Sequence, residues 1–473
     1  MRLQATFLNE RIELLEGVYE EERAEQLLAL TKAYNRRIGP ITSVNLLRPE
    51  LLDLSMYSAY CHHVPSVSLI RDLATKWEPT PRILPGGGKG ISTLDALLGA
   101  FGEMAERLLG TVHCMAISNQ IVHATYSQLI RQGHTALGPQ EMPIFAPEQY
   151  ARPKFEYSEF REDSFLGWVE GTELLTGDPV LVPAQLVLMY YKPHPDEHLI
   201  GYSTTAGGAF HTSRVQAILH GLYEVMERDA VNINWYCRLR PPHVELDLHS
   251  ILPAYFRPRR VRMSNPYIAE VQVCLATLDT PVTALTAIAI DKSRQERAFL
   301  GGSGASTRRE LALAQAVFEV GQCQTGFRCD NPFGRNPIYE DSDSSEVVEF
   351  FDAPLYFGFS KNLPRTYWYT SSEETVSWEE VPTWEFESEL EELDAMAQWL
   401  AVNKHRPIVF DFSSACWPGV SITKIFVPGL TQACPPLNPM LGHSRFYELP
   451  KQLGITDRLL SFNDLSVDPI PFA

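Results

Sequence analysis

Two segments of the chain repeat one arrangement of two glutamates and an arginine, in residues 103–107 (EMAER) and residues 224–228 (EVMER). Residues three apart lie on one face of an α-helix, so each segment places two carboxylates side by side. Like charges at this spacing repel each other unless a cation joins them. The apolar residues around both segments recur at helical spacing on the opposite face. The repeat therefore predicts two amphipathic helices whose acidic faces bind something positively charged.

A third helix is predicted to carry matching polar residues. It begins at the capping box in residues 307–310 and places Gln315 and Glu319 along one flank. A single Glu-x-x-Glu-Arg segment is most often a solvated helix face with an i,i+4 ion pair. Two copies on matched faces and a third acidic helix favour a common site. The acids of this predicted site are Glu103, Glu106, Glu224, Glu227 and Glu319.

Clustered carboxylates indicate a hard cation. Mg²⁺ takes oxygen ligands, keeps several waters and is usually held by few carboxylates together with substrate phosphates, so a nucleotide polyphosphate is its natural companion. Residues 86–90 (GGGKG) precede the first acidic helix, but Gly90 stands where a Walker A loop needs Ser or Thr, which excludes that motif. Lys89 either approaches a phosphate as a point charge or belongs to a glycine loop that caps the helix.

Composition limits the class of protein. The chain has 473 residues and a formal charge of −18, from 40 basic and 58 acidic residues. This balance argues against nucleic acid as the main partner, because phosphate backbones need a basic surface. The eight cysteines include no C-x-x-C pair, so a disulfide framework or a zinc site has weak support. The chain shows no apolar run long enough to span a membrane, and we expect a cytoplasmic protein.

The order of elements predicts an α+β fold, with mixed or antiparallel sheets and packed helices, because helices and hairpins alternate without regular βαβ units. Residues 1–80 are predicted to form an N-terminal helical segment. Residues 81–455 are predicted to form the catalytic domain, with an acidic, aromatic-rich surface elaboration at residues 334–395. Residues 456–473 form a proline-containing C-terminal tail.

Strands are expected between and after the acidic helices. A β-hairpin is predicted within residues 165–191. Further strands are predicted at residues 271–275, 281–290, 408–412 and 422–427. Residues 301–304 (GGSG) are predicted to form a turn. Asp229 falls on the apolar face of its helix, so it needs a buried partner that the sequence does not identify.

The chain resembles the YcaO family from about Gly86 to its C-terminus. The segments that carry the resemblance are Gly88-Lys89-Gly90, both glutamate helices, residues 227–230 (ERDA) followed by Trp235, and Gln315 with Glu319. The resemblance implies a YcaO-type ATP-binding fold in which the five acids named above hold Mg²⁺ against the phosphates of ATP. The residues that it implies as nucleotide contacts are Lys89, Gln216, Arg228 and Gln315. The chain departs from the family at Gly99, where a serine is often found, and at Thr212 and Gln216.

The C-terminal tail points to one branch of this family. Azoline-forming members end in Pro-x-Pro-x-Pro at the active site, and this chain ends in residues 469–473 (PIPFA), without the last proline. Proline pairs are also common in disordered tails, but residues 427–429 and 442–445 match the family's C-terminal layout. The resemblance implies catalytic roles for Pro469, Pro471 and Ala473. The terminal carboxylate of Ala473 and the imidazole of His220 are the candidate general bases, and the tail is expected to make few core contacts.

The resemblance implies an ATP-dependent peptide cyclodehydratase. A Cys, Ser or Thr side chain of a ribosomal precursor peptide would attack the preceding amide carbonyl, ATP would phosphorylate the oxyanion, and loss of phosphate would leave a thiazoline or oxazoline. The implied partners are the precursor peptide, a leader-binding E1-like protein and a flavin-dependent azoline dehydrogenase, with a homodimer within the complex as an option. Two alternatives stay open: thioamide or amidine formation by the same phosphorylation, and a non-catalytic ATP-binding scaffold.

Overall fold

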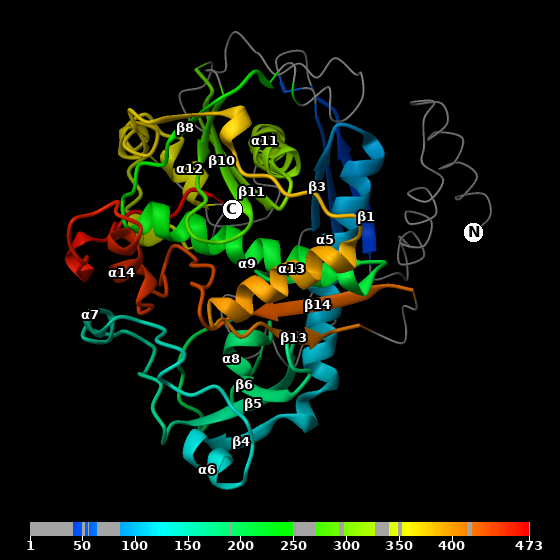
Figure 1. Ribbon diagram of the computed structural model, residues 1–473, viewed down its shortest axis with the longest axis vertical. Coiled ribbons are helices and arrows are strands. Elements are labelled where there is room, and N and C mark those ends of the chain that lie inside the picture. Colours follow the sequence, from blue (N-terminus) through cyan, green and yellow to red (C-terminus); the bar gives the residue numbers. More distant parts are fainter. Residues whose placement is uncertain are drawn as a thin grey trace.

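The computed structural model describes residues 41–49, 53–54, 56–63, 86–189, 191–248, 251, 271–292, 298–326, 340–348, 352–413 and 419–472. Most of the predicted N-terminal helical segment, Ala473 and parts of the acidic region lie outside the described residues. Within these ranges the chain forms three sheets with helices packed between and around them (Figure 1).

The first sheet has the antiparallel strand order β1-β2-β3. Its strands are β1 (Ile41–Leu47), β2 (Tyr57–His63) and β3 (Gly86–Gly90). The second sheet has the order β4-β5-β13-β14-β7, with β6 paired to β5. Its strands are β4 (Val122–Thr125), β5 (Phe165–Glu173), β6 (Pro179–Pro183), β7 (Gly208–His211), β13 (Ile408–Asp411) and β14 (Ser421–Phe426).

The third sheet has the order β11-β10-β9-β8-β12, and only its β8–β12 pair is parallel among the described strand pairs. Its strands are β8 (His243–Glu245), β9 (Gln272–Leu275), β10 (Thr283–Ile290), β11 (Phe299–Ser306) and β12 (Thr375–Ser377). The mixture of antiparallel and mixed sheets with packed helices confirms the predicted α+β class. β5 and β6 confirm the predicted hairpin, and β9, β10, β13 and β14 confirm the four further predicted strands.

Three long helices lie between the sheets: α5 (Thr93–Ala116), α9 (Arg214–Tyr236) and α11 (Arg309–Gly326). α5 packs on the first sheet and contacts β7 and β14 of the second, α9 packs between the second and third sheets, and α11 packs on the third sheet and contacts the first. Figure 1 shows α9 crossing the middle of the molecule. Each of the three acidic helices therefore connects two of the three sheets.

The remaining helices are short or peripheral. The α-helices are α6 (Tyr126–Arg131), α7 (Pro147–Tyr150), α8 (Ala184–Val187), α12 (Asp352–Phe357), α13 (Glu389–Val402) and α14 (Arg445–Gln452). The 3-10 helices are η1 (Ser118–Gln120), η2 (Ser344–Glu346), η3 (Leu363–Thr366), η4 (Trp378–Glu380) and η5 (Phe462–Asp464).

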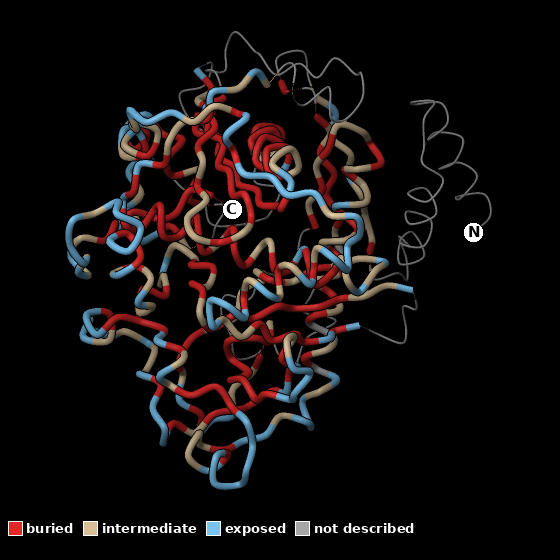
Figure 2. The backbone as a smooth tube through the Cα atoms, in the orientation of Figure 1, coloured by how far each residue is buried: buried red, intermediate tan, exposed pale blue. Residues whose placement is uncertain are grey.

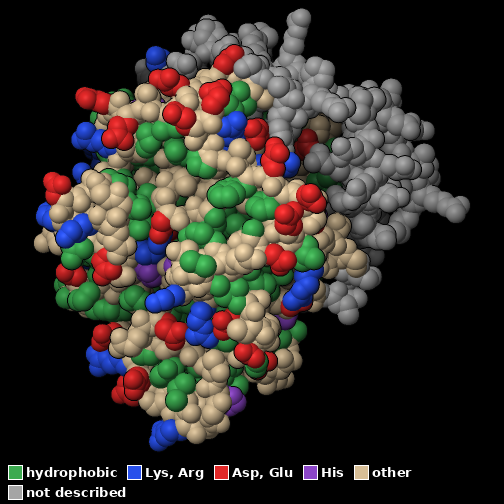
Figure 3. All heavy atoms as spheres, viewed as in Figure 1, with side chains coloured by type: hydrophobic (Ala, Val, Ile, Leu, Met, Phe, Trp, Pro, Cys, Tyr) green, Lys and Arg blue, Asp and Glu red, His purple; other side chains and the backbone are tan. Residues whose placement is uncertain are grey.

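None of the helices in the described ranges is long and apolar enough to cross a membrane. Figure 3 shows basic and acidic side chains interspersed over the face in view.

Each long helix follows a glycine-containing strand: β3 leads into α5, β7 into α9 and β11 into α11. In two of these strand–helix units the helix lies so close that only glycine fits. A Cβ atom at Gly88 would lie 1.9 Å from the carbonyl oxygen of Ala96, and a Cβ atom at Gly302 would lie 2.3 Å from that of Ala316. The predicted glycine loop at residues 86–90 and the predicted turn at residues 301–304 are therefore wrong. Both segments are strands, because the helix fills the space that side chains would take.

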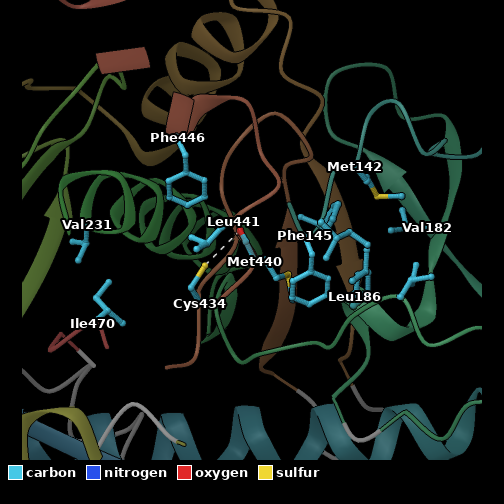
Figure 4. Close-up of a cluster of buried hydrophobic side chains, with 14 of the residues drawn as sticks. Met142, Phe145, Val182, Leu186, Val231, Cys434, Met440, Leu441, Phe446 and Ile470 are labelled. Atoms are coloured by element: carbon cyan, nitrogen blue, oxygen red, sulfur yellow. Dashed lines mark hydrogen bonds between the residues drawn. The ribbon is translucent and has the colours of Figure 1, made fainter. Parts of the chain in front are cut away.

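The C-terminal tail belongs to the core. Ile470 is 2% exposed and Phe472 is fully buried. Figure 4 shows Ile470 beside Val231 of α9, and Figure 2 shows buried residues, in red, in the middle of the molecule. The ring of Phe472 lies 5.3 Å from that of Tyr369, which comes from the acidic region predicted to be a surface elaboration. The expectation of few core contacts is wrong, because the tail and residues 352–369 cover α9 together.

Asp229 obtains its buried partner from α14. Its Oδ1 atom accepts hydrogen bonds from Arg445 Nε at 3.0 Å and from the Thr431 N–H at 2.8 Å. Arg445 also donates to Asp279 at 2.9 Å. The predicted need for a partner is confirmed, and the ion pair fixes α14 and the following chain against α9.

Candidate functional site

Glu103 and Glu106 lie about one turn apart on α5. Glu103 accepts a backbone hydrogen bond from Gly87 of β3 and forms an i,i+4 ion pair with Arg107. The pair lies at the boundary between the interior and the solvent, since the side chains of Glu103 and Arg107 are 31% and 16% exposed. Glu106 faces β7, where a Cβ atom at Gly208 would lie 2.6 Å from its Oε1 atom. The α5 acids therefore face two different sheets.

The acids of α9 are divided in the same way. Glu224 Oε2 accepts a hydrogen bond from the Gly207 N–H at 3.1 Å, on the side of the second sheet. Glu227 Oε1 accepts a hydrogen bond from the Ser303 hydroxyl at 2.6 Å, on the side of the third sheet. Arg228 Nη2 lies 3.3 Å from the same Glu227 oxygen. Glu227 is 8% exposed and Glu224 is of intermediate exposure, and both carboxylates have specific partners.

Glu319 of α11 completes the arrangement. Its Oε2 atom accepts a hydrogen bond from the Ser303 N–H at 2.9 Å, and its Oε1 atom forms an ion pair with Lys89 of β3. Glu227 and Glu319 therefore meet at Ser303 of β11. Lys89 connects the first sheet to this point instead of extending into solvent, since its side chain is 25% exposed.

One acid of each long helix accepts a backbone N–H from the strand, or the turn before the strand, of its own strand–helix unit. The pairs are Gly87 with Glu103, Gly207 with Glu224 and Ser303 with Glu319, at separations of 16, 17 and 16 residues. A backbone N–H directed at a carboxylate fixes its orientation. The three units therefore present three oriented carboxylates at one junction.

The five acids form a row, called here the carboxylate row, in which each acid repels the next. Repulsion acts from Glu103 to Glu106, from Glu106 to Glu224, from Glu224 to Glu227 and from Glu227 to Glu319. Basic side chains lie along the row and attract its members: Arg107, Lys424, Arg228 and Lys89. The row thus carries more carboxylates than these cations can neutralise.

The three acids at the centre of the row have raised pKa values, chiefly because they are buried. Burial raises the pKa of Glu106 to about 8, and repulsion from Glu224 adds to the effect. Burial raises the pKa of Glu224 to about 7 against the attraction of Arg228. Burial also raises the pKa of Glu227, again against Arg228 and with repulsion from Glu319. A further cation placed among these groups would favour their ionised forms.

The donor set of the row fits Mg²⁺. All its acidic groups offer oxygen ligands, which a hard cation prefers. In the ranges that the structure describes, no three His, Cys, Asp or Glu side chains are grouped closely enough to hold a metal ion by themselves. A Mg²⁺ ion bound there would take few carboxylates and complete its shell with phosphate oxygens and water, which is its usual coordination beside nucleotides.

Lys424 of β14 is a site residue that the sequence reasoning missed. Its Nζ atom donates to the Ser203 hydroxyl at 2.9 Å and to the Thr204 carbonyl. Burial lowers its pKa to about 8, while Glu224 and Glu106 act in the opposite direction. The available signal was one lysine inside the predicted apolar strand 422–427, where a buried cation needs acidic partners. Ser303 was also missed, because its segment was predicted to be a turn.

The predicted glutamine contacts lie further along the same helices. Gln315 is exposed and precedes Glu319 by one turn of α11. Gln216 precedes Glu224 by two turns of α9, and its amide donates to Glu389 of α13. His220 lies between these two positions on α9, with its ring 5.6 Å from that of His211. The structure therefore places Gln216 against another helix and leaves Gln315 accessible.

The predicted catalytic prolines approach the row from the tail. Pro469 and Pro471 are buried, and the Pro471 carbonyl oxygen lies 3.3 Å from the position of a Cβ atom at Gly301 of β11. Gly301 and Ser303 share one face of the strand, about 7 Å apart, because side chains alternate along it. The tail therefore reaches the strand that binds Glu227 and Glu319. Ala473 lies outside the described residues.

Comparison with known proteins identifies the family. The family model described as YcaO cyclodehydratase, ATP- and Mg²⁺-binding, matches residues 87–431. The chain belongs to the YcaO family. An uncharacterized protein of Methanothermobacter thermautotrophicus is 28% identical over 281 residues, which are 56% of this chain and 66% of that relative. The family resemblance, and ATP with Mg²⁺ as its cofactors, are confirmed.

Three solved structures have this fold at low sequence identity. A heterocyclase in complex with substrate and cofactor has a TM-score of 0.72 at 18% identity, over 95% of this chain and 57% of that chain. YcaO from Methanopyrus kandleri, bound with AMPPCP and Mg²⁺, has a TM-score of 0.58 at 19% identity, over 86% and 91%. The E. coli microcin synthetase McbBCD complex contains a chain with a TM-score of 0.51 at 16% identity, over 93% and 99%. The YcaO chain spans little more than half of the first heterocyclase chain.

Proposed function

We propose that the chain is an ATP-dependent cyclodehydratase that forms thiazoline or oxazoline rings in a ribosomal precursor peptide. The observation that carries the proposal is the course of the C-terminal tail, which brings Pro471 beside Gly301 of β11. Two residues along this strand, Ser303 donates hydrogen bonds to Glu227 and Glu319. The tail and the acids proposed to hold Mg²⁺ would then act on one substrate.

In the proposed reaction, a Cys, Ser or Thr side chain loses its thiol or hydroxyl proton and adds to the carbon of the preceding backbone amide. The carbonyl oxygen takes the γ-phosphoryl group of ATP, which releases ADP, and then leaves as phosphate. The amide nitrogen loses its proton and forms the C=N bond. The net change is the loss of one water from the peptide. Mg²⁺, when bound, supplies charge neutralisation to the transferred phosphoryl group.

The residues of the carboxylate row, the residues beside it and the tail residues are proposed to have different roles. Glu103, Glu106, Glu224, Glu227 and Glu319 are proposed to hold Mg²⁺ and do not attack the substrate. Lys89 and Arg228 are proposed to contact phosphates, because each lies beside Glu227 or Glu319 and carries a positive charge. Gln315 and Gln216 are proposed to contact the nucleotide further along α11 and α9, which requires Gln216 to leave Glu389. Pro469, Pro471 and Ala473 are proposed to position the catalytic groups of the tail.

Partner proteins are part of the proposal. A chain of the McbBCD complex has this fold, which supports a YcaO protein that works within an assembly. We therefore propose a leader-binding E1-like partner that delivers the precursor peptide, and a flavin-dependent dehydrogenase that oxidises azolines to azoles. A homodimer within the complex remains part of the same proposal.

The test is mass spectrometry of candidate precursor peptides after incubation with the chain, its partner, ATP and Mg²⁺. Short Cys/Ser/Thr-rich peptides encoded beside the gene are the substrates to use. Loss of the mass of one water per ring supports the proposal. Exchange of oxygen for sulfur, or addition of an amine with loss of water, would assign the chain to thioamide or amidine formation. ATP binding without turnover under all these conditions would indicate a scaffold.

A further inference from the structure

The residue before the first tail proline is held at both its side chain and its backbone. Asp468 is 4% exposed, and its carboxylate forms an ion pair with Arg365 of η3. Arg238 Nη2 lies 3.7 Å from the other carboxylate oxygen. The Asp468 carbonyl accepts a hydrogen bond from Trp235 Nε1 at 3.0 Å. Asp468 is therefore fastened to α9 and to the segment after α12.

Arg365 is held in turn by its own surroundings. Its Nη1 atom donates to the Tyr356 hydroxyl at 2.6 Å, and its guanidinium carbon lies 5.8 Å from the centre of that ring. Tyr356 is 2% exposed, which fixes its ring within the core. A planar guanidinium held on one side by a buried tyrosine presents its remaining donors in a fixed direction. The position of Arg365 thus determines that of Asp468.

The chain between Asp468 and its end has little freedom of its own. Residues 469–472 (PIPF) carry no charge, and the two prolines have fixed φ angles and no backbone N–H. At the far end, the ring of Phe472 lies 6.3 Å from that of Trp235 and 5.3 Å from that of Tyr369. Two end contacts and a stiff segment between them set where Pro471 meets Gly301. A shift at Asp468 is therefore transmitted to the tail beside the carboxylate row.

We propose that Arg365 and Asp468 form a latch that fixes the C-terminal tail beside β11, with Arg365 acting as a positioning residue. The part of this inference that concerns the reaction rests on the proposed function, whereas the latch is a property of the chain alone. The ion pair is mostly buried on the Asp468 side, with 6% side-chain exposure. Removal of Arg365 leaves the buried carboxylate with only the more distant Arg238, and removal of the Asp468 charge leaves Arg365 without its carboxylate partner. Either change loosens the tail.

The test compares variants of the full chain with a matched control. Asp468→Asn and Arg365→Gln remove the latch, and Arg365→Lys keeps the charge. Asp464→Asn is the control, because it removes a bidentate pair with Arg458, at 2.9 and 2.6 Å, only four residues earlier. Carboxypeptidase release of Phe472, followed by mass spectrometry well below the unfolding temperature, reports the opening of the tail.

In the variants that lack the latch, carboxypeptidase is expected to release Phe472 at least about tenfold faster than in the unaltered chain. A tenfold change requires only a modest shift in the equilibrium between the packed and the released tail. Arg365→Lys should recover part of the protection, and Asp464→Asn should match the unaltered chain. Release at the same rate in Asp468→Asn and Asp464→Asn would overturn the proposal. So would equal release in all variants.

A second measurement separates positioning from mere stability. With a peptide that the unaltered chain converts, Arg365→Gln is expected to lower kcat for ring formation at least about tenfold while the Kd of Mg·ATP stays within about twofold. An unchanged kcat despite released Phe472 would overturn the positioning role. Failure of the unaltered chain to form rings, with the difference in Phe472 release intact, would instead reject the proposed function and leave the latch standing.

Discussion

At the scale of single residues, the glutamates of the carboxylate row differ in how far their charge is already satisfied. Glu103 has a backbone N–H from Gly87 and the guanidinium of Arg107. Glu224 has the Gly207 N–H, but burial raises its pKa to about 7. Substitution of an acid in this row therefore changes stability in a direction that depends on its partners, even where the effect on the reaction is the same.

Glu224→Gln and Glu103→Gln are expected to differ in their effect on stability while both abolish ATP turnover. Glutamine at 224 keeps an oxygen for the Gly207 N–H and removes a buried charge, so the melting temperature should stay equal or rise. Glutamine at 103 removes the ion pair of Arg107, which should cost about 1–3 kcal/mol. Differential scanning fluorimetry and a phosphate-release assay measure the two effects. Equal losses of stability in both variants would contradict the assigned partners.

Glu106 gives the row a pH-dependent effect on stability. Burial raises its pKa to about 8 in the folded chain, above the ordinary value of 4.5 for a glutamate. The folded state therefore keeps a proton that the unfolded state has lost, so stability falls as the pH rises from about 4.5 through 8. Glu106→Gln mimics the protonated group. The difference in free energy of unfolding between this variant and the unaltered chain should therefore increase, in favour of the variant, by at least about 1 kcal/mol from pH 5.5 to pH 8.5. Urea unfolding at both pH values, without Mg²⁺, measures this. A constant difference would mean that Glu106 does not titrate there.

At the scale of elements, the close contact of glycine strands with helices determines where the acids lie. The Glu103 and Glu319 carboxylates can accept backbone N–H groups of β3 and β11 because α5 and α11 lie directly on these strands. A side chain on the helix-facing side of either strand would separate helix from strand. The acids would then lose their orientation together with the packing.

Gly88→Ala and Gly302→Ala are expected to destabilise the chain severely or to prevent its folding. In both, the new methyl group would lie under 3.0 Å from a helix carbonyl oxygen, which is backbone and cannot turn away. Gly110→Ala is the control. Its methyl group would lie 3.7 Å from Phe412, and alanine in a helix interior should stabilise by up to about 1 kcal/mol. Soluble yield and thermal unfolding measure the difference. Normal unfolding of Gly302→Ala would refute the close packing of α11 on β11.

At the scale of the whole molecule, the sequence could predict what depends on local spacing. The three acidic helices, their i,i+3 glutamates and several strands follow from periodicities of a few residues. Lys424 joins the row, and Arg445 reaches Asp229, only through chain folding over some two hundred residues. No local pattern encodes such contacts. The glycine runs and the apolar tail were misjudged because both depend on what packs against them.

The burial of the tail makes it a structural element as well as a proposed part of the active site. Phe472→Ala is expected to lower the free energy of unfolding by about 3–5 kcal/mol, because it empties a fully buried aromatic site. Val467→Ala is the control, since Val467 is 78% exposed and its truncation should change stability by about 0.5 kcal/mol or less. Urea midpoints at constant slope provide the measurement. Equal midpoints for both variants would place Phe472 outside the core.

The charge of the whole molecule determines how a nucleotide can bind. ATP is a polyanion, the chain carries −18, and the carboxylate row has more acids than the cations beside it, so a divalent ion must neutralise both sides of the contact. We expect the Kd of ATP, measured by calorimetry, to be at least about tenfold lower in Mg²⁺ than in EDTA. Glu170→Gln, at an exposed position of β5, should keep this difference, whereas Glu227→Gln should reduce it. Equal affinity for ATP in Mg²⁺ and in EDTA would show that the row does not bind ATP through a metal ion. The lysine and arginine side chains would then be the principal contacts of ATP.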